Sequence, residues 1–241
     1  MGLVDLHCHL LWGVDDGCRA PGDALEAARA LVALGYEAAA QTPHARADFP
    51  SRDAALCEAR HAELEALLER EGVALRLHPG AENFLDEGFL DRVARGVPRA
   101  LGASARTVLV ELPFAGAVPA LPDLLFRIRL KGLVPLVAHP ERCAEFERPG
   151  RAEEAVRLGA ALQLDVGALT GRYGRGARRL AERLLGDGLY AVAATDLHGP
   201  AEAERWVSEA LEALERRAGS AEAGRLTRDN PRRVLAGEDL A

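Results

Sequence analysis

Short apolar segments alternate with longer amphipathic segments along almost the whole chain. The apolar segments have the length of buried strands, and the amphipathic segments repeat apolar residues every three or four positions, as helices do. Strands are predicted at residues 3–6, 37–42, 73–78, 107–110, 133–138, 161–166 and 189–194. Helices are predicted at residues 23–34, 51–72, 121–131, 153–158, 176–185 and 201–217. Residues 85–99 are expected to be less regular, and residues 230–233 to lie in a polar tail.

Turn and cap residues separate these predicted elements. Asp23 is expected to cap the first helix and Ser51 to begin the second, and glycines follow most of the predicted helices. There is no linker-like tract and no internal repeat, so one domain is expected over residues 1–241. The alternation predicts parallel βα units, arranged either as a single barrel or as a doubly wound sheet.

Histidine and acidic residues stand at or just after the carboxyl ends of the predicted strands. In a parallel barrel these ends meet on one face, where active sites are built. Each residue alone has an ordinary structural explanation, but chance does not place this set after six different strands. The residues are His7, His9, His44, Glu82, Glu111, His139, Asp196 and His198.

The spacing of these side chains indicates a metal site. His7 and His9 stand two residues apart, which places both imidazoles on the same face of an extended strand, and Asp196 and His198 repeat this spacing. Asp16 follows the first pair in a glycine-marked turn. Imidazole and carboxylate ligands suit Mn, Fe or Zn. With Asp16 the set exceeds what a single ion needs, because catalytic sites leave positions open, so two or three divalent metals are inferred.

Composition narrows the classes of function. The chain has 241 residues, a net charge of −7 and a sequence pI near 5.6, which argues against a nucleic-acid-binding surface. No apolar run approaches the ~20 residues that span a bilayer, and the first residues lack a basic leader. We therefore expect a cytoplasmic protein without membrane insertion. The four cysteines form no Cys-x-x-Cys pair and are expected to be free thiols.

A cluster of metals beside an arginine suits phosphoester hydrolysis. The metals lower the pKa of a bridging water to give hydroxide and stabilise charge on the phosphoryl oxygens. Arg142, three residues after His139, is the expected phosphate ligand. The chain has no Cys-x5-Arg loop, no Walker A motif, no Gly-x-Gly-x-x-Gly and no Gly-x-Ser-x-Gly elbow, which leaves the metal route among these phosphate chemistries.

The motifs that carry these residues resemble those of the polymerase and histidinol phosphatase (PHP) superfamily. Within it, the chain is most similar to the bacterial PHP-type protein-tyrosine phosphatases encoded with capsule and exopolysaccharide genes. The resemblance extends from the first strand to Asn230-Pro231. Its motifs are Asp-Leu-His-Cys-His at residues 5–9, Gly-Val-Asp-Asp-Gly at 13–17, Thr-Pro-His at 42–44, Gly-Ala-Glu at 80–82, Glu-Leu-Pro-Phe at 111–114, Ala-His-Pro-Glu-Arg at 138–142 and Thr-Asp-Leu-His at 195–198.

The resemblance implies a distorted (β/α)7 TIM-like barrel with a trinuclear site that is usually associated with manganese. By position, it implies three ligand sets: His7, His9, Glu82 and Asp196; Glu82 as a bridge with Glu111 and His139; and Asp16, His44 and His198. Arg142 would contact the phosphate. The implied partner is a bacterial tyrosine kinase with a tyrosine-rich tail.

Three positions depart from the pattern of this family. Trp12 stands where these phosphatases usually have proline, and Thr195 where they usually have serine. A second family arginine beyond the last histidine has no aligned match, because Ala203 lies near its place, and Arg205 is a candidate substitute. Trp12 lies in the first loop and is a candidate wall for an aromatic substrate.

We therefore expect metal-dependent hydrolysis of phosphotyrosine in a protein substrate, linked to capsule or exopolysaccharide regulation. Asp16, His44 and His198 are expected to take part in catalysis together with Arg142. One alternative is a small-molecule phosphomonoesterase, such as a phosphatase that acts on histidinol phosphate. A second alternative is a metal-bound scaffold without catalytic activity.

Overall fold

Parallel strands form the centre of the molecule. The computed structural model describes residues 1–240, in which eight strands form one sheet of order β1-β2-β3 and a second of order β4-β5-β6-β7-β8. Every pair of neighbouring strands is parallel. The strands are β1 (Leu3–Cys8), β2 (Tyr36–Gln41), β3 (Arg76–Pro79), β4 (Glu82–Phe84), β5 (Thr107–Glu111), β6 (Val134–Ala138), β7 (Ala161–Asp165) and β8 (Val192–Ala194).

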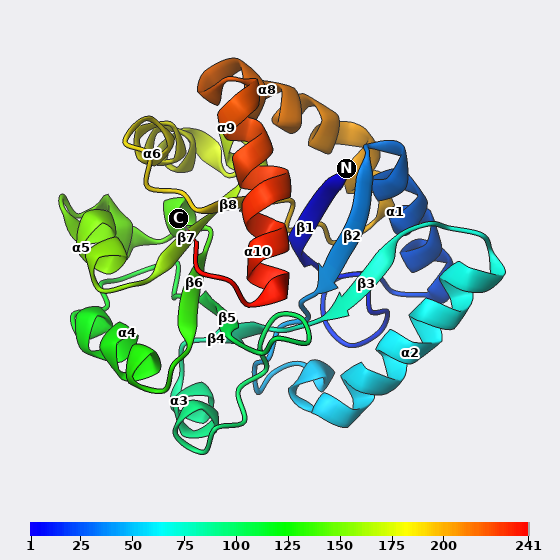
Figure 1. Cartoon of the computed structure of the whole chain (residues 1–241), viewed down its shortest axis with the longest axis horizontal. Helices are drawn as coiled ribbons and strands as arrows, with labels where there is room; N and C mark the ends of the chain where they lie inside the picture. The colour runs from blue at the N-terminus through cyan, green and yellow to red at the C-terminus, as the bar shows by residue number, and fades with distance from the viewer. Residues whose placement is uncertain (241) are drawn as a thin grey trace.

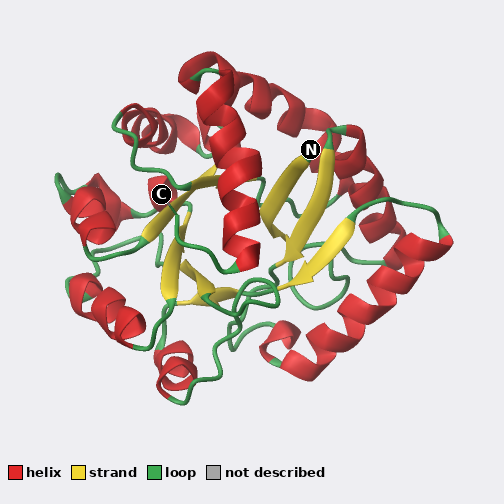
Figure 2. Ribbon diagram, in the orientation of Figure 1, coloured by secondary structure: helices red, strands yellow, loops and turns green. Residues whose placement is uncertain are grey.

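Helices surround these strands (Figures 1 and 2). The longer ones are α1 (Pro21–Ala33), α2 (Ala54–Arg70), α3 (Glu87–Ala94), α4 (Leu121–Leu130), α5 (Arg151–Arg157), α6 (Gly174–Gly186), α8 (Ser208–Ala218) and α10 (Asn230–Ala236). The short helices α7 (Pro200–Glu202) and α9 (Ser220–Gly224) are followed by π-helical turns at Ala203–Val207 and Arg225–Asp229.

The two sheets approach each other at two junctions, one between β1 and the segment after β8, the other between the loop after β2 and the first residue of β4. Cys8 forms a parallel bridge with Leu197 on one side, and His44 forms one with Glu82 on the other. The expected parallel α/β architecture of a distorted barrel is confirmed. The third predicted strand, residues 73–78, corresponds to β3, whereas β4 follows Gly80-Ala81 and was not predicted. β3 and β4 belong to different sheets, so the described residues form eight strands where seven were predicted.

Several helix boundaries differ from the sequence-based expectation because the caps lie elsewhere. α1 begins at Pro21, and the side chain of Asp23 accepts hydrogen bonds from the backbone of residues 19 and 20 at 3.1 Å. Asp53, not Ser51, caps α2. The expectation of an irregular stretch at residues 85–99 is wrong, since Asp86 caps α3 by accepting a 2.7 Å hydrogen bond from Phe89 N.

The central strands β5 and β6 are mainly apolar because both of their faces are buried. Leu109 and Leu136 point into one core cluster inside the barrel, whereas Val110 and Val137 belong to a second cluster that includes side chains of the surrounding helices. This packing explains why these two strands are nearly continuous apolar runs without a polar face.

The carboxyl-terminal segment closes the amino-terminal end of the barrel, so the prediction of a polar tail is wrong. α10 lies across the front of the strands in Figure 1, and Val234 is fully buried in the inner core cluster with Leu109 and Leu136. Asn230 Nδ2 donates a 2.7 Å hydrogen bond to the backbone oxygen of Ala191, just before β8. The end that α10 covers is opposite the strand ends that carry the histidine and acidic residues.

Two further observations concern membrane-spanning helices and cysteines. No helix in residues 1–240 combines the length and the apolar character needed to cross a membrane. The four cysteines are buried, and none of them forms a disulfide within this part of the chain.

Replacement of Val234 by alanine is expected to lower the free energy of unfolding by about 2 kcal/mol, because it removes two buried methyl groups and leaves a cavity in the barrel. Urea denaturation followed by circular dichroism measures this change. Val97→Ala is the matched control: Val97 is 58% exposed, and we expect its change to stay within about 0.5 kcal/mol. Equal effects of the two variants would contradict a core role for α10.

Candidate metal centre

The structure brings together all nine histidine and acidic residues expected at the site. Their ligand atoms form four overlapping groups, and within each group all atoms lie within 4.8 Å of one another. The groups are His7, His9 and Asp196; His7, Glu82 and His139; His44, Glu82 and Glu111; and His9, Asp16, His44 and His198. Because members are shared, the groups form one continuous cluster at the carboxyl ends of the strands.

Glu82, the first residue of β4, is at the centre of this cluster. Its carboxylate is fully buried and faces four imidazoles. Oε1 lies 2.9 Å from His139 Nε2, and Oε2 lies 2.7 Å from His44 Nδ1, 3.4 Å from His7 Nε2 and 3.7 Å from His9 Nε2. Burial alone would raise the pKa of Glu82, but the imidazoles outweigh it and hold the pKa well below its usual range.

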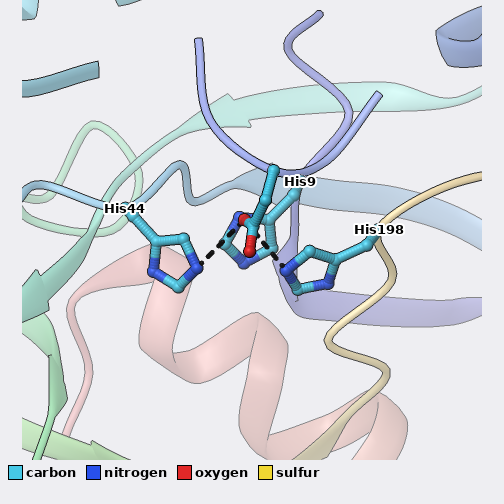
Figure 3. A group of neighbouring side chains, drawn as sticks. His9, His44 and His198 are labelled. Atoms are coloured by element: carbon cyan, nitrogen blue, oxygen red, sulfur yellow. Dashed lines mark ion pairs between the residues drawn. The ribbon is translucent and has the colours of Figure 1, made fainter. Parts of the chain in front are cut away.

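The outer part of the cluster is built around Asp16. Oδ1 of Asp16 lies 3.3 Å from His44 Nε2 and 3.4 Å from His198 Nε2, and Figure 3 shows these two imidazoles with that of His9 between them. Hydrogen bonds from His198 and His44 lower the pKa of Asp16. The Asp16 side chain is 56% exposed, whereas Glu82 is fully buried, so the cluster is open to solvent on the side of Asp16.

Two further residues orient the imidazoles. Gln163 Oε1 lies 3.0 Å from His7 Nδ1, and Asp15 Oδ2 lies 2.8 Å from His9 Nδ1. With Nδ1 protonated, Nε2 of each ring keeps a lone pair directed into the cluster. Neither Gln163 nor Asp15 was predicted as a site residue from the sequence. The available signal was weak: Gln163 is a lone amide in an apolar strand, and Asp15 is one of two adjacent aspartates.

Close backbone packing fixes the loop that carries Asp15 and Asp16. Asp15 Oδ1 accepts a 3.0 Å hydrogen bond from Gly17 N. A Cβ atom at Gly17 would lie 2.3 Å from the backbone oxygen of His9, so only glycine fits at this position. Ser51 N donates a 2.9 Å hydrogen bond to Val14 O, and Ser51 Oγ donates to His44 O. Ser51 therefore ties this loop to the loop that carries His44.

The electrostatics of the cluster favour positive charge. Burial disfavours the charged imidazoles, yet Glu82 and Asp196 raise the pKa of His7 to about 10. The close carboxylates of Asp16 and Glu82 likewise outweigh burial and raise the pKa of His44 to about 11. Burial and the charge of Glu82 together raise the pKa of Glu111 to about 7. A divalent cation would neutralise the negative charge of these buried carboxylates.

The residues present fit bound metal. Buried imidazole nitrogens and carboxylate oxygens face one another here without a hydrogen-bond partner among the described residues. Leaving such atoms unsatisfied is costly, and a cation between them would satisfy nitrogen and oxygen together. These atoms are His7 Nε2, His9 Nε2, His44 Nδ1, Glu82 Oε2, Glu111 Oε2, His139 Nδ1 and Asp196 Oδ1.

Arg142 borders the cluster, as the sequence predicted. Its Nη1 donates a 2.6 Å hydrogen bond to Asp196 Oδ2 and lies 3.6 Å from Asp165 Oδ2. Its guanidinium lies 4.5 Å from the ring centroid of Phe114 and 4.2 Å from that of Tyr173. Burial would lower the pKa of Arg142, but Asp196 and Asp165 raise it, so the charge is retained.

Trp12 and Thr195 depart from the family pattern, and Arg205 is the candidate substitute for the second family arginine. Trp12 is partly buried against the core, with the guanidinium of Arg60 5.3 Å from its ring centroid. Thr195 is buried, and its hydroxyl donates a 2.5 Å hydrogen bond to Asp5 Oδ2. Arg205 is exposed in the turn Ala203–Val207. A role of Trp12 or Arg205 in substrate binding stays a prediction.

The fold and the cluster define a class of protein: a parallel α/β barrel with a candidate metal centre at the carboxyl ends of its strands. Residues 3–236 match the family model described as "Capsular polysaccharide synthesis, CpsB/CapC". The chain belongs to this family, which confirms the resemblance noted from the motifs.

Relatives agree with this assignment. The chain is 31% identical over 219 residues to the tyrosine-protein phosphatase YwqE of Bacillus subtilis, covering 90% of this chain and 86% of YwqE. It is 23% identical over 244 residues to the tyrosine-protein phosphatase CpsB of Streptococcus pneumoniae, covering 97% of this chain and 98% of CpsB. A crystal structure from the work on YwqE and CpsB, called there metal-dependent tyrosine phosphatases, has a TM-score of 0.89 at 29% identity, covering 99% of this chain and 96% of that one.

The fold is shared more widely. The phosphotriesterase homology protein of Escherichia coli has a TM-score of 0.64 at 13% identity, covering 97% of this chain and 98% of that one. This likeness concerns the fold alone.

Replacement of Gln163 by leucine is expected to weaken divalent-metal affinity by about tenfold to a hundredfold, because the tautomer and orientation of His7 are no longer fixed. Competition with a chelating indicator measures the affinity. Gln41→Leu is the matched control, since Gln41 is also buried on a strand, where its Nε2 contacts Cys8 Sγ at 3.7 Å. Equal losses in both variants would show that Gln163 acts through general packing.

Proposed function

We propose that the protein is a metal-dependent phosphotyrosine-protein phosphatase, a phosphoric monoester hydrolase of capsule or exopolysaccharide systems. The observation that carries the proposal is the cluster itself, in which nine imidazole and carboxylate side chains converge beside Arg142. The names of YwqE and CpsB as tyrosine-protein phosphatases support the same activity.

The cluster is proposed to hold two or three divalent ions, with manganese as the expected metal and iron or zinc as alternatives. Glu82 is the proposed bridging ligand, since its two oxygens face different imidazoles. When bound, such ions lower the pKa of a coordinated water and neutralise charge on a phosphoryl group. The proposed ligand sets follow the motif resemblance: His7, His9, Glu82 and Asp196; Glu82, Glu111 and His139; and Asp16, His44 and His198. In the structure Glu82 lies with both members of the second set, but Glu111 is grouped with His44 and His139 with His7.

The chain's own residues determine how a substrate approaches. Asp16 and His198 form the more exposed side of the cluster, so a phosphoryl group enters there and not past the buried Glu82. Arg142 keeps its positive charge beside Asp196 and is the proposed ligand of the phosphoryl oxygens. A phenolate is a good leaving group, so phosphotyrosine needs little general-acid assistance.

The proposed substrate is a phosphotyrosine protein, specifically a bacterial tyrosine kinase, in the cytoplasm. The names of the relatives support a protein substrate, and the identity of the kinase rests on the motif resemblance. We also propose that residues 1–241 act as a single domain, in line with the family match over residues 3–236.

Metal removal provides the first test. Chelator-treated protein is expected to lose hydrolysis of an aryl phosphate and to regain it with Mn²⁺. Glu82→Ala is expected to reduce the Mn²⁺-restored rate by about a hundredfold or more, because it removes the proposed bridging ligand. Full activity of the chelated protein, or of Glu82→Ala, would contradict metal dependence at this cluster. Inactivity with every metal would favour the non-catalytic scaffold.

Substrate preference provides the second test. The value of kcat/KM for a phosphotyrosyl peptide from a bacterial kinase tail is expected to exceed that for histidinol phosphate by about tenfold or more, because the phenolate is the better leaving group and the rim is lined by aromatic side chains. Steady-state kinetics with the same Mn²⁺-loaded preparation give both values. A higher kcat/KM for histidinol phosphate would favour the small-molecule phosphatase.

A further inference from the structure

A second arginine borders the candidate metal centre at a different carboxylate from Arg142. Arg46 lies two residues after His44, in the loop that follows β2. Its Nη1 lies 3.9 Å from Glu111 Oε2, whereas Arg142 contacts Asp196. Its side chain is 34% exposed, so the guanidinium is accessible at the mouth of the site.

The guanidinium of Arg46 is held along one edge by Asp48 and lies over two aromatic rings. Asp48 accepts two hydrogen bonds, from Nε at 3.1 Å and from Nη2 at 2.8 Å. This paired geometry fixes the plane of the guanidinium. The ring centroid of Phe84 lies 4.9 Å from its central carbon and that of Phe49 lies 5.6 Å away. Phe49 in turn stacks on the imidazole of His44 at 5.1 Å.

These contacts leave Nη1 directed toward the metal centre. Asp48 occupies Nε and Nη2, and none of the described residues accepts a hydrogen bond from Nη1. The distance of 3.9 Å to Glu111 is too long for a hydrogen bond. The guanidinium therefore has a fixed orientation and one unused donor nitrogen beside a buried carboxylate. This arrangement suits the binding of an anionic group that enters the site.

We propose that Arg46 is a second substrate-binding arginine, whose Nη1 donates a hydrogen bond to a phosphoryl oxygen of the substrate. This inference rests on the proposed function, because it names a specificity residue of the same site. Arg142 and Arg46 then bind the phosphoryl group from the side of Asp196 and from the side of Glu111. Two guanidinium groups match the double negative charge of a phosphate monoester better than the single charge of a diester.

The test compares the Mn²⁺-loaded wild type with Arg46→Met. Methionine keeps an unbranched side chain against Phe84 and Phe49 but removes the donor nitrogen Nη1. Calorimetry measures the Kd of inorganic phosphate, steady-state kinetics measure KM and kcat for an aryl phosphate, and elemental analysis measures bound manganese. Kd and KM are expected to rise about tenfold, the factor for one charge-assisted hydrogen bond, with manganese content unchanged.

Two further variants sharpen the comparison. Arg95→Met is the matched control, because Arg95 is an arginine on the surface that pairs with Asp91 at 2.7 Å, and we expect wild-type values for it. Asp48→Asn keeps Arg46 but weakens its orientation, and we expect a rise in Kd of about threefold, smaller than that of Arg46→Met.

The outcomes separate the inference from the proposed function. Wild-type Kd and KM in Arg46→Met would overturn the inference. Loss of manganese from Arg46→Met would also overturn it, since Arg46 would then support Glu111 and not the substrate. A wild type that fails to hydrolyse aryl phosphate but binds phosphate through Arg46 would refute the phosphatase assignment and leave the inference standing.

Discussion

The burial of Glu82 among imidazoles is the interaction on which the rest of the site depends. A buried carboxylate is tolerated only with compensating positive charge or metal, and Glu82 has four imidazoles around it. The same residue joins the two sheets, since Glu82 N donates a 3.2 Å hydrogen bond to Pro43 O and Glu82 O accepts one of 2.8 Å from Ala45 N. At this junction the same residue therefore takes part both in the cluster and in the contact between the sheets.

The other junction between the sheets also joins candidate ligands directly. Asp196 N donates a 2.9 Å hydrogen bond to His7 O, and His9 N donates one of 2.8 Å to Leu197 O. His139 and Asp196 also adopt positive φ values of 32° and 52°, which cost residues other than glycine about 1–3 kcal/mol each. Both strained residues are candidate ligands. The strain is maintained because the barrel junctions and the imidazole contacts fix these backbones, and it directs the side chains into the cluster.

The sequence predicted the candidate ligands well because their positions follow from a local rule: a polar residue at the end of an apolar parallel strand faces the common site. Residues whose role depends on partners far away in the sequence are not predicted by this rule. Gln163 acts on His7, which is remote in sequence, and nothing local distinguishes it from a structural amide. The closing helix α10 was missed because only the short apolar stretch Val234-Leu235-Ala236 follows its arginines, and the burial of Val234 arises only where the strands already form a barrel.

The arginines complete the electrostatic organisation. The chain contains one lysine, so among its cationic side chains the binding of a phosphoryl group falls almost entirely to arginine. Both rim arginines lie against aromatic rings, Arg142 near Phe114 and Tyr173 and Arg46 near Phe49 and Phe84. A planar guanidinium gains orientation from such faces, whereas an ammonium group would remain mobile. The two arginines differ in how far they engage the buried carboxylates: Nη1 of Arg142 donates a 2.6 Å hydrogen bond to Asp196, whereas Nη1 of Arg46 stays 3.9 Å from Glu111. Both keep their positive charge at the edge of the cluster, where an incoming anion would meet it.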